Sequence, residues 1–350
     1  MSKINYYLIT GGLGIIGSNI VKKIIKNNKN SKLIILDNFT VYIDPLRSNY
    51  GDYRKDRFRD VINFDKYRSS KSNRIIVERG NASDPKITLE ILEKYKPKII
   101  FHTAAMPLAK INNPIANDFK VGSVDTTTNI LECVDTVQKK LKYKLDRFLY
   151  LSSSMVYGDF KKSSVTEEEK LKPKEVYGTM KLAGEIITSG MCNQFKIPYT
   201  IVRPSAVYGP TDMNQRVTQY FIEKADAGET LYVHGKDEKL DFTYVEDFAD
   251  GCILAAKNLK GIGQIFNITN GKARSLLEYA KILKKYFPNL KYKIVERDHK
   301  RPKRGTLNIN KAKKLLKFKP KFDLEKGTEI YVKYFKKQKL IQNKWKLLQK

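Results

Sequence analysis

Tyr177 and Lys181 lie four positions apart in the segment VYGTMKLAGE, which has the pattern of a helix. Residues with this spacing share one helical face, so the ammonium group would stand one turn from the phenol. An ammonium there stabilises the phenolate and lowers a pKa that is normally about 10. The pair could therefore act as a general base, although Tyr-x-x-x-Lys alone is a common spacing.

Three serines, Ser152, Ser153 and Ser154, follow the apolar segment RFLYL ahead of that helix. In a doubly wound sheet the end of this strand would lie at the edge where ligands bind. Ser153 could then hydrogen-bond a substrate hydroxyl and Tyr177 together. The alternative is that these hydroxyls only satisfy hydrogen bonds at the end of a buried strand.

The segment TGGLGIIG, residues 10–17, follows an apolar strand and opens the helix-like SNIVKKIIKN. Gly11, Gly14 and Gly17 permit a tight turn, close backbone approach and a helix N-terminus directed at a pyrophosphate. Asp37 ends the next strand, twenty residues after Gly17, where a carboxylate can hold both hydroxyls of an adenosine ribose. A carboxylate repels a 2′-phosphate, so the pattern favours NAD over NADP. The alternative is a glycine turn followed by an N-capping acid.

Short apolar segments with strand character alternate with helical patterns through the first half of the chain. The predicted strands span residues 6–10, 32–37, 74–80, 98–105, 147–153 and 198–204. This alternation predicts an α/β fold with a Rossmann-type doubly wound parallel sheet. Beyond the sixth strand the pattern loosens, which indicates a smaller α/β C-terminal substrate lobe.

The chain accordingly divides into three parts. An NAD-binding Rossmann domain spans 1–204, with an insertion at 41–73 that is far longer than a usual strand-to-helix connection. A mainly substrate-binding lobe spans 205–335, with segments around 241–269 returning to the Rossmann domain, and 336–350 form a polar tail. The insertion is either a functional loop over the site or a mobile segment, and the sequence leaves both open.

The net charge is strongly positive. The 350 residues include 67 Lys and Arg against 37 Asp and Glu, a formal charge of +30. Such a charge is compatible with nucleic-acid binding, but the lysines are spread along the chain and no basic stripe is interleaved with stacking aromatics. We predict no nucleic-acid partner, and we expect the positive field to favour anionic substrates.

Targeting signals and metal-binding patterns are also lacking. No segment approaches the roughly 20 apolar residues that cross a bilayer, and the N-terminus lacks a signal-peptide layout, which predicts a cytoplasmic protein without a membrane span. Cys133, Cys192 and Cys252 are far apart, as expected of reduced core thiols. With only three histidines in the chain, no metal site is predicted.

Together these motifs resemble the extended short-chain dehydrogenase/reductases, and among them the NAD-dependent nucleotide-sugar epimerase/dehydratase family. The segments that carry the resemblance are TGGLGIIGS, Asp37-Asn38, HTAA (102–105), SSSMVYG, YGTMK, RPSAVYGP (203–210) and DFTYVEDFADG (241–251), in the family's order over roughly residues 5–335. The resemblance implies NAD as cofactor and Tyr177 as the base. It also implies Lys181 as its partner and a ligand of the nicotinamide ribose, and Ser153 as the catalytic hydroxyl.

The resemblance further implies cofactor contacts along the strand ends. These positions are Gly11, Gly14, Ile15, Ile16, Asp37, Asn38, Asn81, Ala82, Ala104, Ala105, Ser123, Tyr177, Lys181 and Pro204. Asn81 stands where the family has an adenine-contacting acid, and Ser123 replaces a frequent asparagine. The implied partners are a nucleotide-diphosphate sugar and a second copy of the chain, in a homodimer built on the helix of Tyr177 and a helix over 118–137.

The two residues after Ser153 discriminate between reactions of the family. Its 4,6-dehydratases place Asp and Glu there, because eliminating water across C5 and C6 needs a general acid and a general base. Here the positions hold Ser154 and Met155, which can do neither. The remaining chemistry is hydride and proton transfer at one carbon. It predicts an epimerase acting at C4 through a transient 4-keto intermediate, in the synthesis of a cell-surface polysaccharide precursor.

Other outcomes stay open. The same site could serve a 4-dehydrogenase or ketoreductase that releases its product. A non-enzymatic NAD-binding sensor or scaffold is a third interpretation, against which the intact Ser153, Tyr177 and Lys181 argue. A 4,6-dehydratase is disfavoured.

Two diphosphate contacts expected from the family are missing. Ala206 stands where the family often has Asn, three residues after the arginine of R-x-x-N-V-Y-G-P, and Leu240 replaces the arginine before Asp-Phe. The predicted substrate-binding residues are Met106, Ser154, Met155, Ala206, Arg216, Lys239, Arg301 and Arg304. For the four basic residues a solvated surface position is the alternative, since the chain is rich in lysine.

Overall fold

The computed structural model describes most of the chain. The described residues are 4–39, 62–63, 69–70, 73–106, 116–212, 216–299 and 301–348. The predicted insertion at 41–73 therefore lies largely outside them. Within it, β3 (Ile62–Asn63) and β4 (Ser69–Ser70) form a short antiparallel pair.

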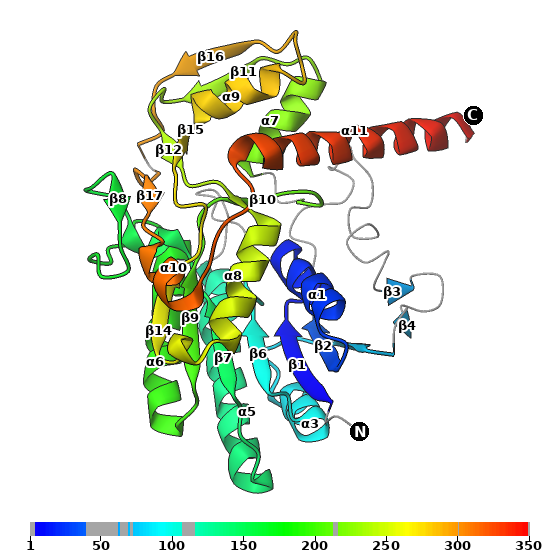
Figure 1. Ribbon diagram of the computed structural model, residues 1–350, viewed down its shortest axis with the longest axis vertical. Helices are drawn as coiled ribbons and strands as arrows, with labels where there is room; N and C mark the ends of the chain where they lie inside the picture. Colours follow the sequence, from blue (N-terminus) through cyan, green and yellow to red (C-terminus); the bar gives the residue numbers. More distant parts are fainter. Residues whose placement is uncertain are drawn as a thin grey trace.

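A parallel sheet of seven strands, in the order β14-β9-β7-β6-β1-β2-β5, forms the centre of the molecule (Figure 1). The bounds are β1 (Asn5–Thr10), β2 (Ser31–Asp37), β5 (Ile75–Arg79), β6 (Ile99–His102), β7 (Arg147–Leu151), β9 (Tyr199–Arg203) and β14 (Gln264–Asn267). The six strands predicted up to residue 204 are all present, which confirms the Rossmann-type fold. The seventh, β14, comes from much later in the chain and pairs with β9.

Helices cover both faces of the sheet. On one face lie α1 (Ile15–Asn27), α8 (Val245–Lys257) and α10 (Asn310–Leu316), and on the other lie α3 (Pro85–Tyr95), α5 (Thr126–Leu141) and α6 (Val176–Phe195). Because successive strand residues point to opposite faces, Leu8 and Ile9 belong to different cores. Strands covered on both sides are apolar throughout, which explains the near-continuous Ile and Leu runs of the sequence.

A second lobe has its own apolar core and lies beyond the carboxyl ends of the strands in Figure 1. Its elements are α7 (Val217–Asp226), β11 (Leu231–His234), α9 (Leu276–Lys284), β16 (Tyr292–Val295) and α11 (Leu324–Leu348). A capping box between Ser275 and Glu278 begins α9. The residues from 336 onward, predicted as a polar tail, continue α11 as far as Leu348.

Short elements complete the fold. They are α4 (Ala116–Lys120), the π-helical η2 (Val121–Asp125), the 3-10 helices η3 (Ser154–Tyr157) and η4 (Leu259–Gly261), and the strands β8 (Ser164–Val165), β10 (Val207–Tyr208), β12 (Lys239–Leu240), β13 (Thr243–Tyr244), β15 (Arg274–Ser275) and β17 (Thr306–Leu307). The strands pair as β10 with β13, β12 with β15 and β8 with β17. The last pair attaches the segment before β17 to the region that follows η3.

The strand order reverses between β1 and β6. In open α/β sheets, ligands bind outside the carboxyl ends of the strands at this reversal. Thr10, Asp37, His102, Leu151 and Arg203 are the last residues of five neighbouring strands. The topology therefore locates the site without reference to any ligand.

The structure also bears on the cysteines, on membrane spans and on metal sites. Cys133, Cys192 and Cys252 are free and buried, which confirms the prediction of core thiols. Within the described residues, no helix is both long and apolar enough to cross a membrane. Over the same part of the chain, His, Cys, Asp and Glu side chains form no group of three suited to a metal ion.

Candidate active site

The turn between β1 and α1 has the shape that a dinucleotide requires. Gly11 has φ +64°, and a Cβ there would stand 2.7 Å from Ala104 Cα, so only glycine fits without strain. Gly14 is the N-cap of α1, and because glycine has no side chain it cannot cap the first N–H groups of the helix. The N–H groups of Ile15 and Ile16 lack intrahelical acceptors because they begin the helix, so an anion is favoured beside them.

Asp37 closes the same turn from the end of β2. Its Oδ2 accepts the N–H of Leu13 at 2.9 Å and its Oδ1 accepts the N–H of Phe39 at 2.8 Å. These bonds fix the carboxylate beside the glycine turn, the position from which it can bind ribose hydroxyls. The exposed Asn38 follows directly. The local geometry thus fits an adenine dinucleotide.

The end of β6 forms the opposite side of this turn. Ala104 N–H donates to Thr10 Oγ1 at 3.3 Å, and Thr10 Oγ1 is 2.8 Å from His102 Nδ1. Burial, helped by the charge of Lys181, lowers the pKa of His102 to about 3, so the imidazole stays neutral. His102 therefore supports the strand ends and carries no charge.

Four other predicted cofactor positions lie around this edge. Asn81 is exposed and its Oδ1 accepts Ser83 N–H at 3.1 Å, while Ala82 is buried against α5, its carbonyl accepting from Asn129. Ala105 packs against η2, and Ser123 of η2 hydrogen-bonds Tyr150. Direct contacts of these residues with the cofactor stay predictions.

The structure brings Tyr177 and Ser153 together across two segments. The Ser153 hydroxyl acts on that of Tyr177 and lowers its pKa, and Ser153 Oγ accepts Met155 N–H at 3.2 Å at the start of η3. Gly178 makes this approach possible, because a Cβ there would lie 2.7 Å from Met155 O. The glycine after the tyrosine is thus explained by the contact between α6 and η3.

The electrostatics of Tyr177 differ from the expectation. Desolvation raises the pKa of Tyr177, and the charge of Arg216 and the Ser153 hydroxyl oppose that rise only in part. The prediction that Lys181 lowers this pKa is wrong for this structure. Lys181 is 3% exposed, and its Nζ turns away to donate to Leu151 O at 2.8 Å, with the Tyr150 ring 5.3 Å from it.

Lys181 is itself a perturbed group. Burial lowers the pKa of Lys181 to about 7, and the Glu185 carboxylate opposes that shift. An amine that is half protonated near neutral pH can take part in proton transfer there. Lys181 therefore remains chemically suited to the role expected of it.

The wall beside Ser153 is free of acid groups at the two discriminating positions. Ser154 and Met155 are both buried in η3, and Ser154 N–H donates to Pro204 O at 2.8 Å. That bond ties η3 to the end of β9. Pro204 therefore lies beside the three serines, and its contact with the cofactor stays a prediction.

The four basic candidates for substrate binding have different surroundings. Arg216 is the N-cap of α7 and donates to Val207 O at 2.8 Å. Its positive charge acts to lower the pKa of Tyr177. Burial lowers the pKa of Arg304 to about 10, with Glu175 as the first opposing charge. Arg301 pairs with Asp298 on the surface, Nε to Oδ2 3.1 Å, and Lys239 is exposed on β12. Arg216 and Arg304 thus lie near the N-terminus of α6, which carries Tyr177, and are the stronger candidates.

A model of the NAD dependent epimerase/dehydratase family matches residues 7–269. The chain belongs to this family. NAD is its cofactor, and the glycine turn, Asp37 and Lys181 are the features of this family member that would hold it.

Individual relatives cover nearly the whole chain. The putative UDP-glucose 4-epimerase of Methanocaldococcus jannaschii is 29% identical over 342 residues, which are 94% of this chain and 98% of that protein. The dTDP-D-glucose 4,6-dehydratase of Dictyostelium discoideum is 29% identical over 287 residues, 78% of this chain and 60% of that protein. The chain therefore spans less than two thirds of that dehydratase.

Solved structures of the family share the fold. UDP-glucuronic acid 4-epimerase from Bacillus cereus, in complex with UDP-glucuronic acid and NAD, has a TM-score of 0.82 at 24% identity, covering 95% of this chain and 99% of that one. UDP-glucose 4-epimerase from Thermotoga maritima, with UDP-glucose, has a TM-score of 0.77 at 26% identity and the same coverage.

Two residues by which this epimerase/dehydratase family member departs from the usual motifs have structural explanations. Leu240 packs against the core of the second lobe. Ala206 has φ +38°, in the left-handed region that Asn and Gly tolerate better than Ala. The backbone at 206 thus keeps the conformation suited to the family's asparagine although the side chain is missing.

The positive φ of residue 206 predicts that Ala206→Asn stabilises the protein. We expect the free energy of unfolding to rise by up to about 1 kcal/mol, since Asn adopts positive φ at lower cost than Ala. Urea denaturation would measure it. Ala227→Asn is the control, because the exposed Ala227 has φ −75° and should gain nothing; equal gains at both positions would contradict the explanation.

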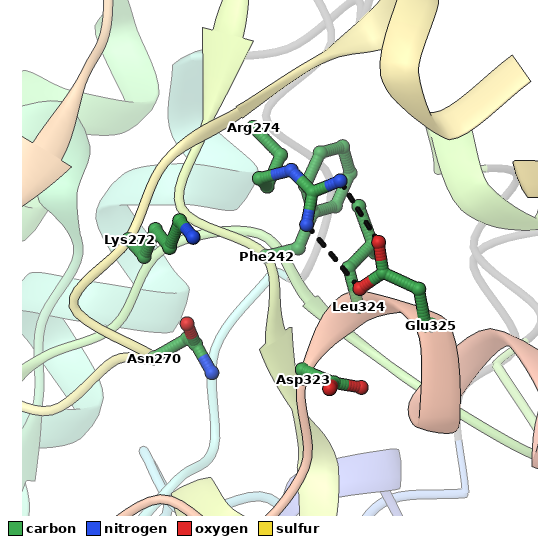
Figure 2. Close-up of a pocket in the computed structure, with 7 residues that line it drawn as sticks. All are labelled: Phe242, Asn270, Lys272, Arg274, Asp323, Leu324 and Glu325. Carbon is green, nitrogen blue, oxygen red and sulfur yellow. Dashed lines mark hydrogen bonds and ion pairs between the residues drawn. The ribbon is translucent and has the colours of Figure 1, made fainter. Parts of the chain in front are cut away.

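A cavity of about 270 Å³ in the second lobe is not the active site (Figure 2). It is lined by Phe242, Asn270, Lys272, Arg274, Asp323, Leu324 and Glu325. Arg274 is already neutralised there by Glu325, Nη2 to Oε1 2.9 Å, and by Glu278, Nε to Oε1 2.8 Å. The cavity includes none of the predicted catalytic residues of this family member.

Sequence reasoning missed one charged group of the catalytic helix. Glu185 follows Lys181 by four positions and is buried in an ion pair with Arg203. The repeated spacing of Tyr177, Lys181 and Glu185 along one helical face was the available signal.

Proposed function

We propose that this chain is an NAD-dependent nucleotide-sugar 4-epimerase. The observation that carries the proposal is the placement of Ser153 beside Tyr177 at the carboxyl edge of the sheet, in a wall whose next two residues are Ser154 and Met155. A site with hydroxyls but no carboxyl pair at that wall can move a proton and a hydride at one carbon. It lacks the acid and base at these positions that would support elimination of water.

The proposed roles follow from these positions. Tyr177, in its phenolate form, removes the proton of the C4 hydroxyl, and Ser153 hydrogen-bonds the same oxygen and orients it. Lys181 supplies positive charge on the face of α6 that carries Tyr177. NAD, held by the glycine turn and Asp37, would supply the acceptor and donor of the C4 hydride. Inversion at C4 would follow if the hydride is returned to the opposite face of the 4-keto sugar while Tyr177 gives the proton back to its oxygen.

The proposed substrate is a nucleotide-diphosphate sugar. Arg216 and Arg304 would supply the positive charge that the missing family contacts usually provide. Guanidinium groups bind phosphate oxygens in two-point contacts. Relatives whose structures contain UDP-glucuronic acid or UDP-glucose support this substrate class, and the overall positive charge would attract such anions.

Replacing Arg304 tests this assignment. We expect Arg304→Gln to raise KM for the nucleotide sugar about 10-fold to 100-fold, because a charge-assisted contact to phosphate contributes roughly 1.5–3 kcal/mol. Steady-state kinetics would measure it. Arg301→Gln is the matched control: Arg301 is 63% exposed and paired with Asp298, so its KM should change less than threefold. Equal effects of both variants would contradict the assignment.

The reaction itself is tested by incubating the protein with UDP-, GDP-, CDP- and dTDP-sugars and following conversion by NMR. The proposal expects interconversion of C4 epimers without net consumption of NAD. Stoichiometric build-up of NADH would instead indicate a 4-dehydrogenase, and a 4-keto-6-deoxy product would indicate a dehydratase. A homodimer and a role in polysaccharide precursor synthesis remain part of the proposal, and sedimentation analysis would test the former.

A further inference from the structure

Helix α6 carries a carboxylate, Glu185, on the same face as Tyr177 and Lys181. Glu185 is 4% exposed, one helical turn beyond Lys181. A carboxylate is buried in this way only when it is paired and fully hydrogen-bonded. Its partners therefore show what the residue does.

The principal partner of Glu185 is Arg203, the last residue of β9. Two parallel bonds join them, Nε to Oε1 2.8 Å and Nη2 to Oε2 2.7 Å, and Arg203 is 1% exposed. Nη1 of Arg203 donates to Tyr157 Oη at 2.9 Å and to Glu167 O at 3.1 Å. The pair thus connects the catalytic helix, the end of a central strand and η3 at fixed geometry.

A second contact connects Glu185 to the catalytic serine segment. Ser152 Oγ donates to Glu185 Oε1, and Ser152 directly precedes Ser153. One residue further back, Leu151 O accepts the Lys181 ammonium at 2.8 Å. The carboxylate therefore holds the end of β7 against the same helical face that presents Tyr177 and Lys181.

We propose that the buried Glu185–Arg203 pair is a positioning device for catalysis: it holds Ser153 in register with Tyr177 and keeps a negative charge one helical turn from the Lys181 ammonium. This inference rests on the proposed function, because it takes Ser153, Tyr177 and Lys181 as the reacting groups. Glu185 and Arg203 would act through these groups without touching the substrate.

The effect of Glu185 on the charge of Lys181 depends on the other groups that face the Lys181 ammonium. His102 of β6 stays neutral, and Tyr150 of β7 presents its ring 5.3 Å from Nζ. Tyr177 is neutral at ordinary pH, because its pKa is raised. Glu185 is the anion that favours the protonated form of Lys181, against the burial that lowers the pKa of Lys181 to about 7.

The test is the pH dependence of Glu185→Gln, which keeps the side-chain shape and removes the charge. We expect the alkaline limb of kcat/KM, where Lys181 loses its proton, to move to lower pH by about one unit. The midpoint of pH-dependent NADH binding, measured by fluorescence, should move in the same direction. A purely structural role for Glu185 would lower thermal stability and leave both midpoints in place.

Asp247→Asn is the matched control. Asp247 is a buried carboxylate on α8 that accepts the N–H groups of Lys321 and Phe322 at 2.9 Å each, so its loss should cost stability without moving either midpoint. If Glu185→Gln leaves too little folded protein, the double variant Glu185→Leu/Arg203→Met removes both buried charges and should move both midpoints in the same direction. A folded variant with unchanged midpoints would overturn the inference. A shifted NADH midpoint in a protein that converts no nucleotide sugar would overturn the proposed function alone.

Discussion

Tyr177→Phe should lower turnover by about 10³-fold, a typical contribution of a positioned general base. The substitution removes only the hydroxyl, which lies beside Ser153. The ring is kept, and with it the edge contact to Phe119, whose ring centroid is 5.8 Å away. We therefore expect NAD affinity and thermal stability to change little, so that the loss falls on the chemical step.

Single-turnover kinetics with the preferred nucleotide sugar would measure this loss directly, since they separate chemistry from product release. Tyr143→Phe is the matched control: its hydroxyl is also hydrogen-bonded, to Pro97 O, but it lies at the opposite end of the sheet. The control should lose some stability and keep its turnover. Turnover of Tyr177→Phe within tenfold of the parent would exclude Tyr177 as the base and would reopen the sensor or scaffold interpretation.

The fold could be predicted from the sequence because its signals are local. Each strand of the first half is a short apolar segment, and all but the one before the 41–73 insertion lead into a helical pattern. Parallel strands covered on both faces produce that pattern. The positions of Gly11 and Asp37 follow from the same local order, since a strand, a glycine turn and a helix are consecutive in the chain. The contact between them, from Leu13 N–H to Asp37 Oδ2, required only the pairing of two successive strands.

The electrostatics of the site could not be predicted in this way, because they depend on residues far apart in sequence. The spacing of Tyr177 and Lys181 correctly gave a shared helical face, but the direction of the Lys181 side chain is set by Leu151 O on β7. Burial raises the pKa of Tyr177, and the charge that partly opposes this rise comes from Arg216, in the second lobe. Helical spacing describes neighbours on one element and says nothing about the strands and loops packed against it.

The same limit applies to the basic residues. Arg301 and Arg304 lie three positions apart in the segment DHKRPKRG and are equivalent candidates in the sequence. In the structure Arg301 pairs with Asp298 on the surface, whereas burial beside Glu175 lowers the pKa of Arg304 to about 10. Tertiary packing, through the pairing of β17 with β8, separates the two.

Arg203→Met should lower the free energy of unfolding by about 3–5 kcal/mol, because it leaves the Glu185 carboxylate buried without its partner. Both side chains are nearly inaccessible, 1% and 4% exposed. Urea denaturation would measure the loss. Adding Glu185→Leu to this variant removes the orphaned charge, so the double variant should regain most of the stability although it has lost a salt bridge. A buried ion pair of this kind need not stabilise the fold relative to apolar residues of similar volume.

Arg147 provides the control that makes this recovery informative. It is also a buried arginine, but it donates to Thr200 Oγ1 and to the carbonyls of Ala255 and Asn258, and no carboxylate among the described residues forms a salt bridge with it. Arg147→Met should cost roughly 1–3 kcal/mol for the unsatisfied acceptors, and Glu185→Leu should not rescue it, because the two sites share no partner. Rescue of Arg203→Met but not of Arg147→Met would show that the penalty at Arg203 is electrostatic. A gain in stability would then not explain why an ion pair is buried here. Glu185 contacts Ser152 and lies one helical turn from Lys181, so catalysis would remain as the reason for burying two charges beside the active site.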